Sequence, residues 1–226
     1  GVEALIRWKH PLRGAIPPDS FIGIAEETGN IRELTEWTLE RALEDRMALS
    51  AAGHDVIISV NISGRLLADR SFCDHVQTMV AGRDHGLCLE ITETAVIENP
   101  TAATASIAMF RAAGLKVSID DYGVGLSSLA YLKMLDADEL KIDKSLVVAV
   151  ADSQRDRLIL KSTIDLAHSL GMSVVAEGVE TSEVQAALAL LGCDAIQGYL
   201  ISRPVPLDDL TAFLEAWSGE DRLAVA

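Results

Sequence analysis

Short apolar stretches alternate with amphipathic stretches along the whole of this 226-residue chain. The apolar stretches are rich in valine, isoleucine and leucine and are too short for helices, which predicts buried strands. The amphipathic stretches repeat their apolar residues at helical spacing and often end at a glycine, which predicts helices. The predicted strands cover residues 2–8, 56–60, 87–92, 115–120, 139–143, 172–177 and 195–197.

The predicted helices fill the intervals between these strands. The Pro- and Gly-rich stretch 10–18 predicts a loop, after which a short helix begins at Asp19 or Ser20 and ends near Gly29. Two short helices are expected within 64–82. The remaining helices are expected at about 31–52, 101–113, 127–134, 153–170, 182–191 and 207–217.

Seven predicted strands that alternate with helices imply parallel strands joined by right-handed crossovers. For a chain of this length the leading architecture is an α/β fold of the TIM-like (β/α)8 barrel type, and an open doubly wound sheet is the alternative. Seven strands are one short of a closed barrel, so the barrel interpretation places one further strand upstream of Gly1. No linker or change of composition divides the sequence, which predicts a single domain over residues 1–226.

The composition of the chain excludes several classes of binding partner. The chain carries 34 acidic and 19 basic residues, a net charge of −15, which argues against binding to duplex nucleic acid. Aromatic residues make up 4% of the chain, too few for a surface that stacks single strands. No apolar run approaches the roughly 18 residues of a membrane helix, so no membrane contact is expected from this segment. The three cysteines lack disulfide or zinc spacing, which fits a reducing, cytoplasmic location.

Polar residues stand at or near the end of almost every predicted strand. The carboxyl ends of barrel strands form the catalytic face, so these side chains are expected to converge. Singly, many have a structural explanation, such as a helix cap at Asn61 or an acidic turn at Asp120. Glu90 lies within an apolar run and must be paired or bind a metal. The candidates are Glu3, Arg7, Asn61, Glu90, Glu93, Asp120, Asp121, Lys141, Glu177 and Gln197.

The residue types indicate which chemistry such a site would support. The adjacent carboxylates of Asp120 and Asp121 would repel each other without a cation beside them. Carboxylates with one amide oxygen, and no histidine or cysteine, form the hard ligand set that Mg²⁺ or Mn²⁺ prefers. A pair of such ions supports in-line attack of water on a phosphodiester. Lys141 could orient or deprotonate that water or stabilise phosphoryl charge, and Arg7 suits a second phosphate.

The candidate residues fall within short motifs along the chain. These motifs are Glu3-Ala-Leu5 with Arg7-Trp8, Val60-Asn-Ile-Ser63, Leu89-Glu-Ile-Thr-Glu93, Ile119-Asp-Asp-Tyr-Gly-Val-Gly125, Leu140-Lys-Ile-Asp143, Val175-Ala-Glu-Gly-Val-Glu180, and Ile196-Gln-Gly-Tyr199 with Arg203-Pro204. In this order they resemble the EAL domain, the bacterial phosphodiesterase of the second messenger cyclic di-GMP. The resemblance covers essentially the whole chain and implies metal-dependent hydrolysis of cyclic di-GMP to linear pGpG. The alternative within the family is a catalytically weak EAL domain that acts as a cyclic di-GMP receptor.

The resemblance also implies a ligand set for two ions of Mg²⁺ or Mn²⁺. The first ion would be held by Glu3, Asn61, Glu90 and Asp120. The second would be held, directly or through water, by Asp120, Asp121 and Glu177.

The same resemblance assigns roles to the remaining candidates. Lys141 resembles the residue that contacts the nucleophilic water, supported by Glu177 and by Gln197, which also lies in the substrate site. Glu3 is expected to be required for turnover because it supplies ligand charge. Arg7 resembles the ligand of the substrate phosphate. Glu93 resembles a glutamate that braces the loop after the Asp pair and is not itself a ligand.

Three further expectations follow from the resemblance. The family barrel has an antiparallel strand encoded just before the Glu-Ala-Leu motif, so this chain is expected to be an N-terminally truncated part of a larger signalling protein with a sensory domain upstream. Family members often dimerise through helices beside the loop at 122–128, which predicts a homodimer. In this loop Tyr122, Val124 and Leu126 replace a phenylalanine, a threonine and an aromatic residue of the family. These replacements are expected to alter the turnover rate.

A different class of magnesium-dependent barrel enzyme would use Lys141 as the base that removes a proton next to a carboxylate. This alternative fits the motifs poorly.

Overall fold

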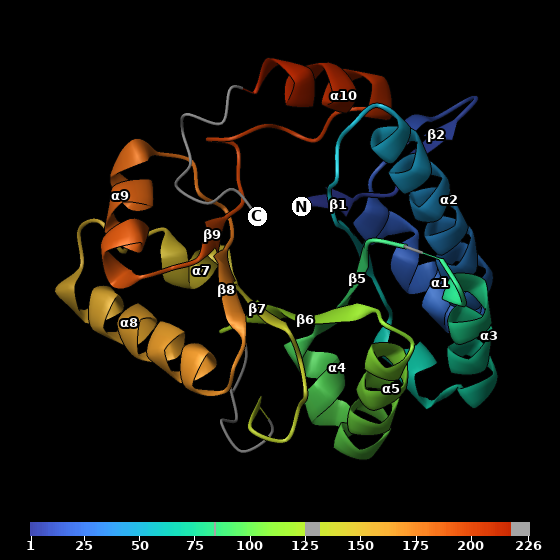
Figure 1. Cartoon of the computed structure of the whole chain (residues 1–226), viewed down its shortest axis with the longest axis horizontal. Coiled ribbons are helices and arrows are strands. Elements are labelled where there is room, and N and C mark those ends of the chain that lie inside the picture. Colours follow the sequence, from blue (N-terminus) through green and yellow to red (C-terminus); the bar gives the residue numbers. More distant parts are fainter. Residues whose placement is uncertain (84, 125–131, 218–226) are drawn as a thin grey trace.

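The computed structural model describes residues 1–83, 85–124 and 132–217. Its centre is a seven-stranded parallel sheet in sequential order, curled into the wall of a barrel with the helices outside it (Figure 1). This confirms the predicted TIM-like architecture, in the form of a barrel wall whose first and last strands are not paired with each other. The strands are β1 (Val2–Ala4), β4 (Ile58–Asn61), β5 (Leu87–Thr92), β6 (Lys116–Tyr122), β7 (Glu139–Ile142), β8 (Ser173–Ala176) and β9 (Ala195–Ile196).

Helices connect these strands and cover the outer face of the sheet (Figure 1). Several begin at a side-chain cap, such as Thr92, Asn99, Ser153 and Thr181, whose oxygen accepts a hydrogen bond from a backbone N–H of the first turn. The helices are α2 (Ile31–Ala51), the 3₁₀ turn η2 (Gly64–Ala68), α3 (Arg70–Val80), α4 (Glu93–Glu98), α5 (Pro100–Ala112), α7 (Lys144–Val147), α8 (Gln154–Ser169), α9 (Ser182–Leu191) and α10 (Leu207–Ala216).

Two of these helices, α4 and α7, were not expected from the sequence. Each is so short that its apolar residues do not repeat over a second full turn, and periodicity therefore carries no signal. The predicted helix at 127–134 falls mostly on residues outside the described ranges, as does Leu126. Among the described residues, no helix combines the length and apolarity needed to cross a membrane.

The strands β4 to β7 present apolar side chains to the helices and mainly polar ones to the barrel interior. In β5, Leu89 and Ile91 are fully buried against the helical layer, and Glu90 between them points the opposite way because successive strand residues alternate. The parallel register pairs Asn61 with Glu90 and Thr92 with Asp120, which brings the ends of β4, β5 and β6 level. The register therefore carries these polar residues to the same end of the barrel.

The segment between β1 and α2 differs from the prediction. The expected strand 2–8 ends at Ala4, and the expected loop contains an antiparallel hairpin of β2 (Trp8–His10) and β3 (Gly14–Ile16). A 3₁₀ turn η1 (Pro18–Ser20) and helix α1 (Ile22–Thr28) follow, and α1 confirms the short helix predicted to end near Gly29. No residue before Ile31 is fully buried, and only a few, such as Ile22 and Ala25, pack against the core, so the sequence pattern of these elements is weak.

Candidate active site

Lys141 lies at the centre of the carboxylates that the strand ends bring together. Its Nζ is 2.6 Å from Glu177 Oε1 and 2.9 Å from Glu90 Oε1. It also lies 3.5 Å from Asp120 Oδ1 and 3.7 Å from Glu3 Oε2. The lysine is 2% exposed and Glu90 is 1% exposed, so this is a buried ionic cluster rather than a surface one. Acids from β1, β5 and β6, and one directly after β8, thus surround one cation.

Two side-chain amides fix the carboxylate of Glu3. Asn61 Nδ2 donates to Glu3 Oε1 at 2.7 Å, and Gln197 Nε2 donates to Glu3 Oε2 at 2.7 Å. Because Asn61 donates through its nitrogen, its amide oxygen remains available as a metal ligand. Gln197 follows β9 and Glu3 lies in β1, so this hydrogen bond joins the two edge strands of the sheet.

A β-bulge brings the two consecutive aspartates to the same site. The predicted strand end at Asp120 was wrong, because β6 continues to Tyr122. Ile119 pairs with Leu140 and Tyr122 with Ile142, so β6 holds one extra residue there. Asp121 has φ 56°, the only positive φ of a non-glycine residue in the described part of the chain.

The bulge has a direct consequence for ligand geometry. In a regular strand neighbouring side chains point to opposite faces, which would separate Asp120 from Asp121. In the bulge, one carboxylate oxygen from each of them and one from Glu177 all lie within 4.8 Å of one another. The Asp121 N–H also donates to Asp120 Oδ1 at 2.9 Å, which holds the first carboxylate in place. A left-handed backbone costs a non-glycine residue about 1–2 kcal/mol. The Asp121 backbone therefore carries a strain that the surrounding structure maintains, and this strain places the two carboxylates side by side.

Burial and mutual repulsion disfavour ionisation of the acids in the cluster unless a further cation is bound. Burial raises the pKa of Glu90 to about 8 and that of Glu177 to about 7, although Lys141 acts in the opposite direction on both. Burial and the Asp120 charge raise the pKa of Asp121. Burial alone would lower the pKa of Lys141, but the acids around it, Glu90 foremost, raise it above the usual value. Lys141 therefore stays charged and does not neutralise the cluster alone.

The residues present fit a hard divalent cation. Glu90 Oε2 is buried and has no hydrogen-bond partner, which is costly for a carboxylate unless an ion occupies that direction. Asp120, Asp121 and Glu177 offer three further carboxylate oxygens close together. Oxygen donors without nitrogen or sulfur are the set that Mg²⁺ and Mn²⁺ prefer.

Arg7 lies outside the lysine cluster and lines a groove of about 580 Å³. Its guanidinium donates to the Ile6 carbonyl at 3.0 Å, and the side chain is exposed. Trp8 and Phe21 stand edge to face in the same groove, with ring centroids 5.5 Å apart. The sequence did not reveal this groove, because its walls come from a hairpin and two helices whose contact is tertiary.

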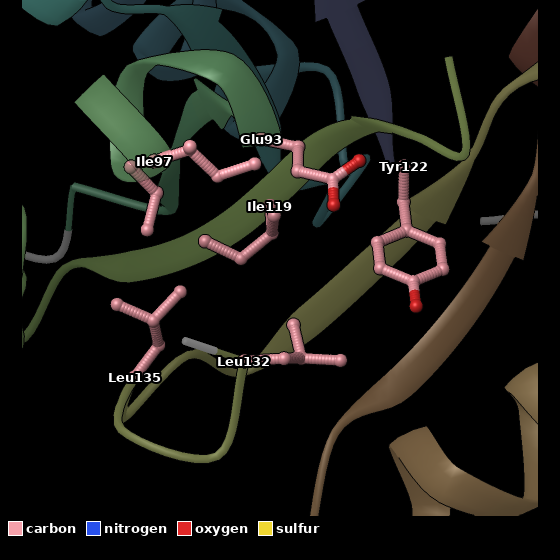
Figure 2. Close-up of a pocket in the computed structure, with 7 residues that line it drawn as sticks. Glu93, Ile97, Ile119, Tyr122, Leu132 and Leu135 are labelled. Atoms are coloured by element: carbon pink, nitrogen blue, oxygen red, sulfur yellow. The ribbon is translucent and has the colours of Figure 1, made fainter. Parts of the chain in front are cut away.

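Glu93 contacts the loop that follows the aspartates. Its Oε2 accepts a hydrogen bond from Gly123 N at 3.2 Å, and the residue is 8% exposed. Figure 2 shows its carboxylate near the Tyr122 ring, at a cavity of only about 10 Å³, which is too small for a substrate. On the other side, a Cβ added to Gly123 would lie 2.2 Å from Leu146 of α7. The start of this loop is thus fixed from two sides, and Val124 beyond it is exposed.

The fold and the site together define a TIM-like barrel protein with a carboxylate-rich, metal-type centre at the carboxyl ends of its strands. The sequence matches the EAL domain family over residues 1–204, and the chain belongs to this family. Known proteins of this kind are similar to it across nearly its whole length.

Two relatives and one solved structure illustrate the similarity. The chain is 42% identical over 220 residues to cyclic di-GMP phosphodiesterase NbdA of Pseudomonas aeruginosa, covering 96% of this chain and 28% of that protein. It is 39% identical over 216 residues to the bifunctional diguanylate cyclase/cyclic di-GMP phosphodiesterase MucR of the same organism, covering 94% and 32%. The structure of the PaMucR phosphodiesterase in complex with c-di-GMP superimposes with a TM-score of 0.84 at 38% identity, covering 92% of this chain and 86% of that one. The chain spans about a third of the length of these two curated relatives.

Proposed function

We propose that this domain hydrolyses cyclic di-GMP to linear pGpG with the help of two divalent cations, Mg²⁺ or Mn²⁺. The observation that carries the proposal is the buried cluster of Glu3, Glu90, Asp120 and Glu177 around Lys141. The names of the relatives, two of which are cyclic di-GMP phosphodiesterases, support the choice of substrate.

The carboxylates at the strand ends, together with the amide oxygen of Asn61, are the proposed metal ligands. Glu3, Asn61, Glu90 and Asp120 would hold one ion, and Asp120, Asp121 and Glu177 the other. When bound, such ions neutralise phosphoryl charge and favour ionisation of the attacking water. Asn61 and Gln197 keep the Glu3 carboxylate in one orientation by their two hydrogen bonds. Glu93 holds the loop after Asp121 through Gly123 N, which preserves the bulge.

Lys141 and Arg7 serve different parts of the substrate. Without bound metal the surrounding acids hold Lys141 in its charged form. As a charged donor it would orient the attacking water through its N–H groups. Arg7 presents a planar fork to the phosphate that does not react. The aromatic side chains beside it in the groove offer apolar surface to a purine base.

Incubation with cyclic di-GMP and Mg²⁺ or Mn²⁺, followed by chromatography of pGpG, tests the proposal. We expect product, and we expect Glu3→Ala to abolish it while Glu40→Ala, an exposed glutamate on α2, leaves the rate unchanged. Tight binding without product would favour the cyclic di-GMP receptor instead. Failure to bind the dinucleotide would favour the proton-abstracting barrel enzyme.

Two partners are part of the same proposal. A homodimer would form through the segments beside the loop at 122–128, where Val124, Met134 and Val148 expose apolar side chains. Light scattering coupled to gel filtration measures this, and a monomer at all concentrations would contradict it. The second partner is a sensory domain upstream, in a larger signalling protein of which this domain would be a cytoplasmic part.

A further inference from the structure

The segment from Leu5 to Asn30, here called the N-terminal excursion, lies at the edge of the core, which it contacts through Ile22 and Ala25. None of its residues is buried, whereas the helix that follows it starts with the buried Ile31. Helix α1 in this segment contributes no buried side chain either. Burial is the main stabilising term for a helix in a domain. In α1 this term comes only from side chains that are partly buried, such as Ile22 and Ala25, so polar contacts matter more to its position.

Two hydrogen bonds tie α1 to the barrel rim. Ser63 Oγ donates to Glu26 Oε1 at 2.6 Å, and Arg65 Nη1 donates to the Glu26 carbonyl at 3.0 Å. The Ser63 hydroxyl also accepts from Arg65 N at 3.4 Å, so the three residues form one connected unit. We refer to Glu26, Ser63 and Arg65 as the rim clamp.

The rim clamp joins two parts of the proposed site. Residues Phe21, Ile24, Ala25 and Thr28 line the groove and recur at i, i+3, i+4 and i+7, which is one face of the helix. Glu26 lies outside this set, so the clamp holds α1 from another side. Ser63 stands two residues after Asn61, whose side chain donates to Glu3 in the lysine cluster.

We infer that Glu26, Ser63 and Arg65 are positioning residues that hold α1 as the wall of the groove beside Arg7, at a fixed place relative to the metal-type centre. This inference rests on the proposed function, since it gives the groove the role of substrate site. Loss of the clamp lets α1 move away from the rim and widens the groove. Substrate binding weakens as a result, and the chemistry at Lys141 does not change.

The test compares four variants in two measurements. Ser63→Ala removes the donor, Glu26→Ala removes the acceptor, and Glu26→Gln keeps an acceptor oxygen for Ser63. Glu27→Ala, an exposed glutamate one residue further along α1, is the matched control. The first measurement is hydrogen exchange of residues 21–28 without substrate, and the second is KM and kcat for cyclic di-GMP.

We expect Ser63→Ala and Glu26→Ala each to accelerate exchange in α1 about ten-fold, since hydrogen bonds to charged acceptors have effects of this order. Each should raise KM by about five-fold or more with kcat within about two-fold, and their effects should not add, because one interaction is lost in both. Glu27→Ala should resemble the wild type, and Glu26→Gln, which keeps an acceptor oxygen without its charge, should lie between the wild type and Glu26→Ala.

Two results would overturn the inference. One is unchanged exchange in α1 of both alanine variants, and the other is a fall in kcat at constant KM. Absence of hydrolysis by the wild-type protein would refute the proposed function, and the exchange measurement would still decide on the rim clamp.

Discussion

Replacement of Lys141 by methionine removes the charge at the centre of the buried acid cluster. Breaking a buried ion pair by removal of one partner typically costs about 3–5 kcal/mol, because the remaining charge is left uncompensated. Lys141 faces four carboxylates at 2.6–3.7 Å, so we expect a loss in this range for the metal-free Lys141→Met protein at pH 8. For a domain of this size, that corresponds to a fall in Tm of roughly 6–20 °C.

The loss should depend on pH in a defined direction. Burial raises the pKa of Glu90 to about 8 and of Glu177 to about 7, from 4.5, even with the lysine present. Between pH 4.5 and 8 the folded protein thus binds more protons than the unfolded chain, so its stability falls as pH rises through this window. Without Lys141 both pKa values rise further, and the variant should regain part of its stability at pH 6.

Thermal and urea unfolding at pH 6 and pH 8, with and without Mg²⁺, measures these effects. Lys161→Met is the matched control, because this lysine forms an exposed i,i+4 pair with Asp165 and its loss should cost less than about 1 kcal/mol. Lys141→Met with wild-type stability at pH 8 in the absence of metal would refute the electrostatic account of the cluster.

Two further predictions concern the metal and the loop. The rise in Tm on addition of Mg²⁺ should be larger at pH 8 than at pH 6, because Glu90 and Glu177 must lose protons to bind the ion. The affinity for Mg²⁺ should change about ten-fold per pH unit for each proton displaced. Scanning calorimetry measures the rise, and an equal rise at both pH values would contradict this prediction. Gly123→Ala should destabilise the domain by about 1–3 kcal/mol in urea unfolding, because its Cβ would lie 2.2 Å from Leu146. Gly53→Ala, with positive φ but open space around it, measures the backbone strain alone, and equal losses for the two glycine variants would argue against the clash.

The barrel was predictable because each strand and each long helix carries its own periodic signal. The apolar runs of β5 and β6 face helices on one side, and the polar residues that interrupt them, such as Glu90, indicated the site before any contact was known. The convergence of these residues then followed from the parallel arrangement.

The remaining features depend on contacts that one segment cannot encode alone. The bulge at Asp121 arises from the pairing of β6 with β7, so the local pattern ended the strand two residues early. The hairpin at Trp8 has no buried face, so its sequence shows no alternation of apolar and polar residues that would predict strands. The groove beside Arg7 exists only once α1 and α2 pack together.

The hydrogen bond between Gln197 and Glu3 spans 194 positions of the chain. Closing a loop of this length is slow compared with forming local helices, so this bond belongs among the last native contacts to form. During synthesis Glu3 leaves the ribosome long before Gln197, and until then only one of its two amide donors exists. A nascent or prematurely terminated chain therefore holds Glu3 less firmly than the finished domain, and both amide donors are present only after β9 and Gln197 have been synthesised.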